Sequence, residues 1–261
     1  MSTVPPDVAQ RLIRDKPWHH EFEIVPGVRT AGAYNPAGLW DEMDLPADMR
    51  GLSVADVGAS CGFFSFQARR RGARVVAFDV LHQDNSGFGL ARYINGLTDI
   101  EHHQVNVLDL RPGEHGPFDI VLAMGLLYHT PDPYRALANC AGMSRDRLVV
   151  ESYCIDALLP STIAGEPLMR FIPDPRRFPG QGQPNADRSN FWGFTSACLA
   201  KMVEDVGFDV QRRHVHGDRV LIDARHSGVE SKATRLRIGY ALRPHVPPGP
   251  DRDHPASWTQ F

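Results

Sequence analysis

Cysteine is scarce in this chain, and no two cysteines are spaced as a metal-binding or redox pair. The 261 residues include only Cys61, Cys140, Cys154 and Cys198, with no Cys-x-x-Cys motif. A disulfide scaffold needs more cysteines, and a zinc ribbon needs them in close pairs. The sequence argues against both classes and favours a reducing compartment.

Long hydrophobic segments are also missing. The longest apolar run, Ile120–Tyr128, is far shorter than the roughly 20 residues that a membrane-spanning helix needs. The first residues, MSTVPPDVAQRLIRDK, lack the apolar centre of a signal peptide. We therefore expect a soluble, cytoplasmic protein with no membrane partner.

Neither sign of charge dominates. Lys and Arg number 28 and Asp and Glu 31, for a formal net charge of −3, so the chain lacks the overall basic surplus of nucleic-acid-binding proteins. Hydrophobic residues make up 42% and charged residues 23%, which is typical of a globular protein. This length predicts one large α/β domain, or one domain with a small cap.

The middle of the chain alternates short β-branched runs with helical stretches, a rhythm typical of parallel βαβ units. Phe118–Met124 is apolar throughout, which predicts a central strand. Asp132 and Pro133 suit the start of a helix. The expected strands are Ser53–Val57, Arg74–Asp79, Gln104–Val107, Phe118–Met124 and Arg147–Tyr153, and the expected helices are Phe63–Arg71, Phe88–Leu97 and Pro133–Cys140.

The rhythm breaks in the proline- and glycine-rich segment 156–190, which predicts a lid-like insertion or a linker. A helix over Thr195–Val206 and a hairpin of Phe208–Val215 and Arg219–Ala224, joined by Gly217-Asp218, should follow. We therefore divide the chain into an N-terminal arm (1–50), a main domain (51–226) and a C-terminal tail (227–261).

A glycine-containing loop between the first strand and its helix is the strongest local signal. Gly58 and Gly62 permit a tight turn and a close approach of the backbone to a ligand. The helix N-terminus supplies N–H groups for polar ligand atoms. An ordinary strand–helix turn is the alternative explanation.

Asp79 ends the next strand, 21 positions after Gly58, where an acid can bind the ribose hydroxyls of an adenosine-containing ligand. Capping of the following helix is the alternative. Ser60 stands where a dinucleotide motif has its middle glycine, and Asp56 would repel a pyrophosphate. The loop therefore favours an adenosine ligand without phosphates over NAD or NADP.

These motifs resemble the class I S-adenosylmethionine-dependent methyltransferases, and within them the group related to the tRNA wobble-uridine carboxymethyltransferase. The similarity runs from about Trp18 to Arg225 and is carried by VADVGASCGFFSFQARRRGARVVAFDV, FDIVLAMGLLYHTPDP, LVVESYCID and NFWGFTSACLAKMVEDVGF. It implies a Rossmann-like, doubly wound sheet of seven mostly parallel strands with an antiparallel last strand. Ser60 and Cys61 depart from the commoner glycine-rich loop.

The resemblance also implies the cofactor S-adenosylmethionine and a set of residues around it. In the wobble-uridine enzymes, the tyrosine at the place of Tyr128 helps to hold a carboxylated cofactor. The other anion-binding groups are not securely matched here, so we expect ordinary S-adenosylmethionine. The implied binding residues are Asp56, Gly58, Ala59, Gly62, Met124 and Gly125 for the methionine part, Asp79 for the ribose, Val80, Asn106 and Val107 for the adenine, and Tyr128.

Two histidines are candidates for a catalytic base, because an unperturbed imidazole titrates near neutral pH. His129 follows the fourth strand, and His20 lies in the arm. The alternatives are a buried structural histidine and a surface histidine, respectively. We expect no metal site, because the pairs His102-His103 and His214/His216 lack an evident carboxylate or cysteine partner.

The insertion offers two kinds of side chain to a substrate. Its arginines favour an acidic acceptor, or else form a solvated basic loop. Its aromatic residues favour an apolar or aromatic acceptor, or else pack on the sheet. The arginines are Arg170, Arg176, Arg177 and Arg188, and the aromatic residues are Phe171, Phe178, Phe191, Trp192 and Phe194.

We therefore expect methyl transfer to a hydroxyl or amine of a small-molecule acceptor, in specialised metabolism. The alternatives are a tRNA wobble-uridine-modifying transferase, an NAD(P)-dependent oxidoreductase and a silent adenosine-binding module. An acidic chain without an evident RNA-binding domain weighs against the tRNA alternative. A homodimer is left open.

Overall fold

The computed structural model describes residues 4–163, 165–174, 176–177 and 189–229. Its centre is a seven-stranded sheet in the order β10-β11-β7-β6-β3-β4-β5. All neighbouring strands are parallel except β11, which runs antiparallel to both β7 and β10. The predicted fold class and its antiparallel last strand are therefore confirmed. The strands are β3 (Ser53–Val57), β4 (Arg74–Asp79), β5 (Glu101–Gln104), β6 (Phe118–Met124), β7 (Ser144–Tyr153), β10 (Phe208–His216) and β11 (Arg219–His226).

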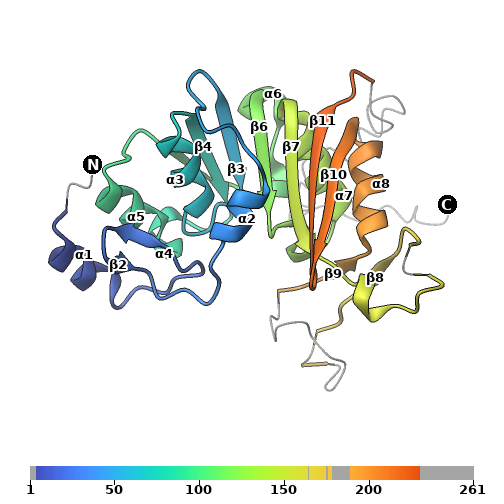
Figure 1. The fold of residues 1–261 in the computed structure, drawn as a ribbon, viewed down its shortest axis with the longest axis horizontal. Coiled ribbons are helices and arrows are strands. Elements are labelled where there is room, and N and C mark those ends of the chain that lie inside the picture. Colours follow the sequence, from blue (N-terminus) through green and yellow to red (C-terminus); the bar gives the residue numbers. More distant parts are fainter. Residues whose placement is uncertain (1–3, 164, 175, 178–188, 230–261) are drawn as a thin grey trace, which may run out of the picture.

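Helices cover both faces of the sheet (Figure 1). One core joins the sheet to α3, α5 and the N-terminal arm, and the other joins it to α7 and α8. Asp132 caps α7 and Thr195 caps α8, each through its side chain. The helices are α1 (Pro6–Ile13), α2 (Ala37–Glu42), α3 (Phe63–Arg70), α4 (Gln83–Ser86), α5 (Phe88–Asn95), α6 (Pro112–His115), α7 (Pro133–Gly142) and α8 (Ser196–Asp205). No helix in the described part of the chain is long and apolar enough to cross a bilayer.

The strand order positions the site. From β3 the chain builds outward to β4 and β5, then returns to the other side of β3 to form β6 and β7. The order of the strands reverses between β3 and β6, and open α/β sheets bind ligands at the carboxyl ends of the strands beside such a reversal. The glycine-containing loop and the segment after Met124 both lie at this end.

The prediction of a third strand over Gln104–Val107 is wrong. The strand is β5, Glu101–Gln104, and Val107 begins a 3₁₀ turn instead. Asn106 caps that turn, because its side chain accepts a hydrogen bond from the Leu108 N–H. β5 is an edge strand with mostly exposed side chains, so it lacks the apolar pattern on which the prediction relied.

The arm and the insertion carry small sheets that were not predicted. In the arm, β1 (Glu23–Val25) pairs antiparallel with β2 (Val28–Arg29). In the insertion, β8 (Met169–Phe171) pairs antiparallel with β9 (Trp192–Phe194). Phe178, Arg188 and the tail from residue 230 lie outside the described residues.

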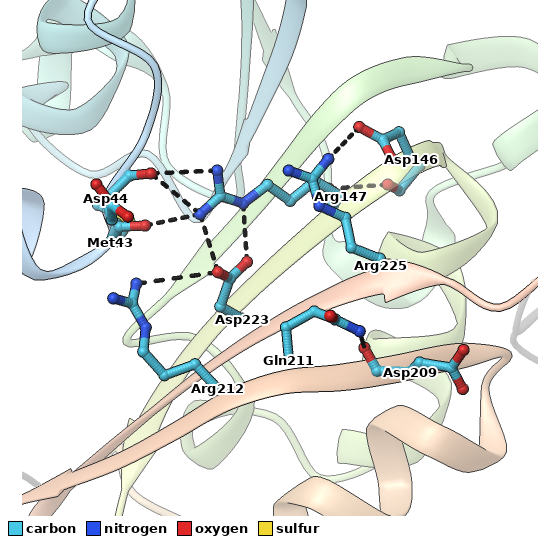
Figure 2. A network of polar contacts seen from close by, with 10 residues as sticks. Met43, Asp44, Asp146, Arg147, Asp209, Gln211, Arg212, Asp223 and Arg225 are labelled. Atoms are coloured by element: carbon cyan, nitrogen blue, oxygen red, sulfur yellow. Dashed lines mark hydrogen bonds and ion pairs between the residues drawn. The ribbon is translucent and has the colours of Figure 1, made fainter.

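A buried arginine ties the arm to the sheet (Figure 2). Arg147 donates to both carboxylate oxygens of Asp223 on β11, at 2.8 and 2.9 Å, and to the carbonyl of Met43 after α2, at 2.7 Å. Its side chain is 6% exposed. Because removal of Asp223 would leave the buried charge of Arg147 without its carboxylate, that change is expected to cost about 3–5 kcal/mol of stability. The hydrogen bond between Arg147 and Met43 thus fixes the end of the arm against β7.

Candidate active site

The loop after β3 has a backbone that only glycine adopts easily at two positions. Gly58 and Gly62 have φ values of +80° and +90°. A Cβ on Gly62 would lie 2.6 Å from the Phe66 ring and 2.8 Å from the Phe88 ring. The N–H groups of Gly58 and Ala59 donate to the Phe78 carbonyl, which joins the loop to the end of β4. The loop is therefore a tightly packed turn with little room for side chains.

Asp79 fastens this loop to the end of the neighbouring strand. One carboxylate oxygen accepts from the Ser60 N–H at 2.7 Å, and the other accepts from the Leu81 N–H at 2.8 Å. Ser60 itself has a φ of +51°, a strained value for a non-glycine residue. An ionised carboxylate has about four acceptor positions, so Asp79 retains capacity for hydroxyl donors.

Asp56 lies beneath the loop. Its carboxylate is 1% exposed and accepts from both the N–H and the hydroxyl of Ser65, at 3.0 and 2.6 Å. Burial raises the pKa of Asp56 to about 6, opposed by the Ser65 hydrogen bonds and reinforced by the charge of Asp79. Asp56 thus holds the first turn of α3 against the end of β3.

The three residues expected around an adenine ring come close to Asp79. Val80 is 59% exposed and directly follows it. The Val105 N–H donates to the Asp79 carbonyl at 2.7 Å, which brings the following Asn106 and Val107 to the same edge. The structure therefore assembles an exposed apolar side chain and a polar turn beside the candidate ribose-binding carboxylate.

The segment after β6 lies over an ion pair that sequence analysis missed. Gly125, with φ +66°, donates from its N–H to the Glu151 carbonyl on β7. The Glu151 carboxylate, 3% exposed, forms a two-point ion pair with Arg219 at the start of β11. Arg219 also donates to the Tyr128 hydroxyl at 3.1 Å and lies 4.9 Å from the centre of its ring. The pair thereby fixes the position of the Tyr128 ring.

Charge coupling within this cluster extends to Tyr34 of the arm. Burial lowers the pKa of Arg219, but the Glu151 carboxylate outweighs it, so the net pKa is raised. Burial and Glu151 raise the pKa of Tyr34, and Arg219 opposes them. The acid Glu151, directly after the apolar run Leu148–Val150, was the one sequence signal for this cluster. Tyr34 and Arg219 had none, because they are distant in sequence.

The two candidate bases have different surroundings. The Nδ1 atom of His129 lies 2.8 Å from the Ser189 hydroxyl, and its ring centre is 4.1 Å from that of Tyr128. His20 is 6% exposed, with its Nδ1 atom 3.4 Å from the Cys61 sulfur. Burial, with a smaller contribution from His19, lowers the pKa of His20 to about 3. His20 is therefore a neutral, enclosed imidazole at physiological pH.

The histidine pairs form no metal cluster within the described residues. His214 contacts the carboxylate of Glu42 in α2, a partner that the sequence did not reveal. The rings of His102 and Phe88 pack together, with their centres 4.8 Å apart. A separate pocket of about 610 Å³, lined by residues such as Arg29 and Arg70, lies between the arm, α3 and α5 rather than at the loop.

The aromatic residues of the insertion differ in their exposure to solvent. Phe194 is fully buried in the core with α8 and cannot face a ligand. Trp192 donates its indole N–H to the Pro131 carbonyl at 3.2 Å. Phe171 and Phe191 are 55% and 37% exposed. Only the last two, among the described aromatic residues of the insertion, present substantial open surface.

Comparisons with known proteins agree with this geometry. Residues 55–147, which include the loop, Asp79 and Tyr128, match the methyltransferase domain family. A ubiquinone biosynthesis O-methyltransferase of Neisseria meningitidis serogroup C (strain 053442) is 31% identical over 203 residues, 76% of this chain and 79% of the relative. A tRNA U34 carboxymethyltransferase of Helicobacter pylori (strain Shi470) is 26% identical over 180 residues, 65% of this chain and 69% of the relative.

A solved structure shows the same fold. The N-terminal domain of EvdMO1, with S-adenosylhomocysteine bound, matches with a TM-score of 0.59 at 20% sequence identity. The match covers 85% of this chain and 97% of that one.

Proposed function

The chain belongs to the class I S-adenosylmethionine-dependent methyltransferases, and from this premise we propose that it methylates a hydroxyl or amine of a small-molecule acceptor, in a biosynthetic pathway of specialised metabolism. The observation that carries the proposal is the loop fastened to Asp79 at the carboxyl ends of β3 and β4. The similarity to an O-methyltransferase supports the acceptor class.

The residues of the loop fit S-adenosylmethionine. Asp79 has spare acceptor capacity for two ribose hydroxyls, and the carboxylates of Asp56 and Asp79 suit a cationic ligand better than a pyrophosphate. Gly58 and Gly62 give the loop its tight turn, and the rings of Phe66 and Phe88 pack against Gly62. We assign the cofactor to Asp56, Gly58, Ala59, Gly62, Asp79, Val80, Asn106, Val107, Met124, Gly125 and Tyr128.

When bound, S-adenosylmethionine supplies an activated methyl group that is transferred to a nucleophile, with S-adenosylhomocysteine as the leaving group. The protein then mainly has to align the acceptor, an effect that can account for about 7–11 kcal/mol of the barrier. The Arg219–Glu151 pair holds the Tyr128 ring at the end of β6, so that this side of the site is preorganised. A base is needed only if the acceptor must lose a proton.

His129 is the stronger of the two base candidates. Its Nδ1 atom contacts the Ser189 hydroxyl, and this contact fixes the orientation of the ring. Because a hydroxyl can donate or accept, the contact is compatible with either tautomer of the imidazole. His20, with a pKa lowered to about 3, is a weak proton acceptor. We therefore propose that His129 accepts the proton of the acceptor group and that His20 supports the loop through Cys61.

Modification of a tRNA uridine is the second candidate, favoured by the similarity to the tRNA U34 carboxymethyltransferase. A protein that binds RNA through its phosphates loses affinity steeply as salt increases. Binding of a tRNA transcript that weakens by about 10³-fold or more between 50 and 200 mM salt, the loss expected for six or more phosphate contacts, would favour this candidate.

A thermal-shift panel tests the cofactor part of the proposal. A ligand that binds only the folded protein at 100 times its Kd adds about 2.7 kcal/mol to the stability. S-Adenosylhomocysteine should raise the melting temperature, whereas NAD and NADP should leave it unchanged. A panel of phenols, amines and tRNA with methyl-labelled S-adenosylmethionine then identifies the acceptor by the labelled product.

A further inference from the structure

The insertion carries a concentration of exposed apolar side chains. Six of the thirteen large hydrophobic residues that are exposed in the described structure fall between residues 158 and 191. We call them the hairpin surface after the antiparallel pair β8–β9, which includes or adjoins four of them; the other two, Leu158 and Ile163, lie earlier in the same segment. They are Leu158, Ile163, Leu168, Met169, Phe171 and Phe191, with exposed fractions from 37% to 57%.

This hairpin is attached to the segment that carries His129, the proposed base. The Phe191 N–H donates to the Tyr128 carbonyl at 2.7 Å. Ser189 contacts His129, and Trp192 donates to Pro131. Residues 189–192 therefore run along residues 128–131, and the hairpin surface begins beside the end of β6.

Close packing holds the hairpin in place. Gly193 lies so near the end of β7 that a Cβ there would be 2.5 Å from Ile155 and 3.0 Å from Tyr153. Ile172 joins these two residues in a small buried cluster. Figure 1 shows β8 and β9 beyond the same end of the sheet where β10 turns into β11. The exposed side chains are thus displayed from an anchored element.

The charge of the insertion indicates which occupant this surface fits. The described residues of the insertion include three acidic residues (Asp156, Glu166 and Asp174) and three basic residues (Arg170, Arg176 and Arg177). The net charge of these described residues is therefore zero. One of the arginines, Arg176, is paired with Asp174. A neutral surface with exposed apolar groups matches an apolar molecule better than a polyphosphate chain.

We infer that the hairpin surface is the docking site for the body of the methyl acceptor, and that the acceptor is an aromatic or otherwise apolar molecule bearing the reactive hydroxyl or amine. This inference rests on the proposed function and narrows its substrate class. Phe171 makes an edge-on contact with Trp192, with ring centres 5.4 Å apart, so its ring has a defined position for stacking on an aromatic acceptor.

The test measures binding of three probes to the protein saturated with S-adenosylhomocysteine, by saturation-transfer NMR. 4-Phenylphenol represents an apolar acceptor, glucose a polar one and uridine a nucleoside. 4-Phenylphenol should bind most tightly. Phe171→Ala and Met169→Ala should each weaken its binding at least fivefold. Leu12→Ala is the matched control, because Leu12 is 42% exposed on α1, outside the insertion.

The outcomes separate this inference from the proposed function. Tighter binding of uridine or glucose, or equal affinity of 4-phenylphenol for wild type and both hairpin variants, overturns the inference. So does a loss of dimers in Phe171→Ala without a change in probe affinity, which would make the surface an interface between copies. Calorimetry with S-adenosylhomocysteine tests the donor site separately, and its affinity should be the same in all variants.

Discussion

The hydroxyl of Ser189 lies 2.8 Å from Nδ1 of His129, although sixty residues separate the two in sequence. His129 follows the end of β6, at Met124, by five positions, and Ser189 lies near the C-terminal end of the insertion. The contact gives the insertion a direct influence on the orientation of the candidate base.

Ser189→Ala should lower turnover with little effect on the affinity for S-adenosylhomocysteine. The change leaves His129 in place but removes the hydrogen bond to its ring, so the base should be less well oriented. We expect a decrease of about tenfold, smaller than the 10²–10⁴-fold that the whole of general base catalysis contributes, because the base itself is kept. Ser189→Thr, which keeps the hydroxyl, should restore turnover.

The pH dependence of kcat distinguishes this positioning role from a structural one. Loss of the hydrogen bond should move the pH at which kcat is half-maximal in Ser189→Ala. A wild-type profile at a uniformly lower rate would contradict the assignment.

His129→Ala should reduce turnover on a hydroxyl acceptor by at least a hundredfold while cofactor affinity is kept, because the methyl donor is already activated and only deprotonation of the acceptor is lost. The measurement is kcat at saturating acceptor, with His216→Ala, an exposed histidine on β10, as the control. Unchanged turnover would remove His129 from the mechanism.

Stability should depend on pH through Asp56. Its pKa is raised to about 6 in the folded protein, mainly by burial, so the folded chain holds this proton more tightly than the unfolded chain does. The resulting stability is present below about pH 4 and is lost as pH rises through about 6. At pH 8 the buried charge costs about 3 kcal/mol, at 1.36 kcal/mol per pKa unit.

Asp56→Asn should therefore be more stable than wild type at pH 8 and nearly equal at pH 4, as measured by urea denaturation at each pH. Asp99→Asn is the control. Its hydrogen bond with Arg69 lowers the pKa of Asp99, so its replacement should give no gain at pH 8. A difference between Asp56→Asn and wild type that is constant with pH would refute this explanation.

His20 should act in the opposite direction over an overlapping range. Its pKa is lowered to about 3 by burial and by His19, so the stability from its neutral form is present above about pH 6.5 and is lost as pH falls towards 3. Between pH 4 and 6 the two groups partly cancel, and Asp56→Asn should make the fall in stability on acidification steeper than in wild type.

Ser60 should tolerate glycine and resist a β-branched residue. Its φ of +51° lies in the left-handed region, which costs about 1–2 kcal/mol for an ordinary side chain and more for a branched one. Ser60→Gly should match or exceed wild type in free energy of unfolding, and Ser60→Val should be less stable than wild type, because a branched side chain adds to the cost that serine already bears. A fully stable Ser60→Val variant would contradict the argument from backbone strain.

The central strands could be predicted from the sequence because their residue patterns are local. β3, β4 and β6 have the predicted bounds, since buried parallel strands are nearly continuous apolar runs. The edge strand β5 could not be found in this way. Its sequence, Glu-His-His-Gln, is stabilised on one side only, by backbone pairing with β4.

The glycine-containing loop and Asp79 could be picked out from the sequence, and the partners of Tyr128 could not. The loop and Asp79 form one βαβ unit with a characteristic spacing. The contact of Arg219 with Glu151 spans 68 residues, and that of Arg219 with Tyr128 spans 91. Such contacts depend on the packing of β7 against β11, which no local sequence pattern encodes.

The most direct test of the proposed cofactor site is calorimetric titration of the wild type and of Asp79→Ala with S-adenosylhomocysteine. The wild type should bind one equivalent, and Asp79→Ala should bind at least tenfold more weakly, because it loses both the ribose partner and the Ser60 hydrogen bond. Asp99→Ala, which alters a surface carboxylate, should bind like wild type. Absence of binding by folded wild-type protein at millimolar ligand, or equal affinity in Asp79→Ala, would contradict the account.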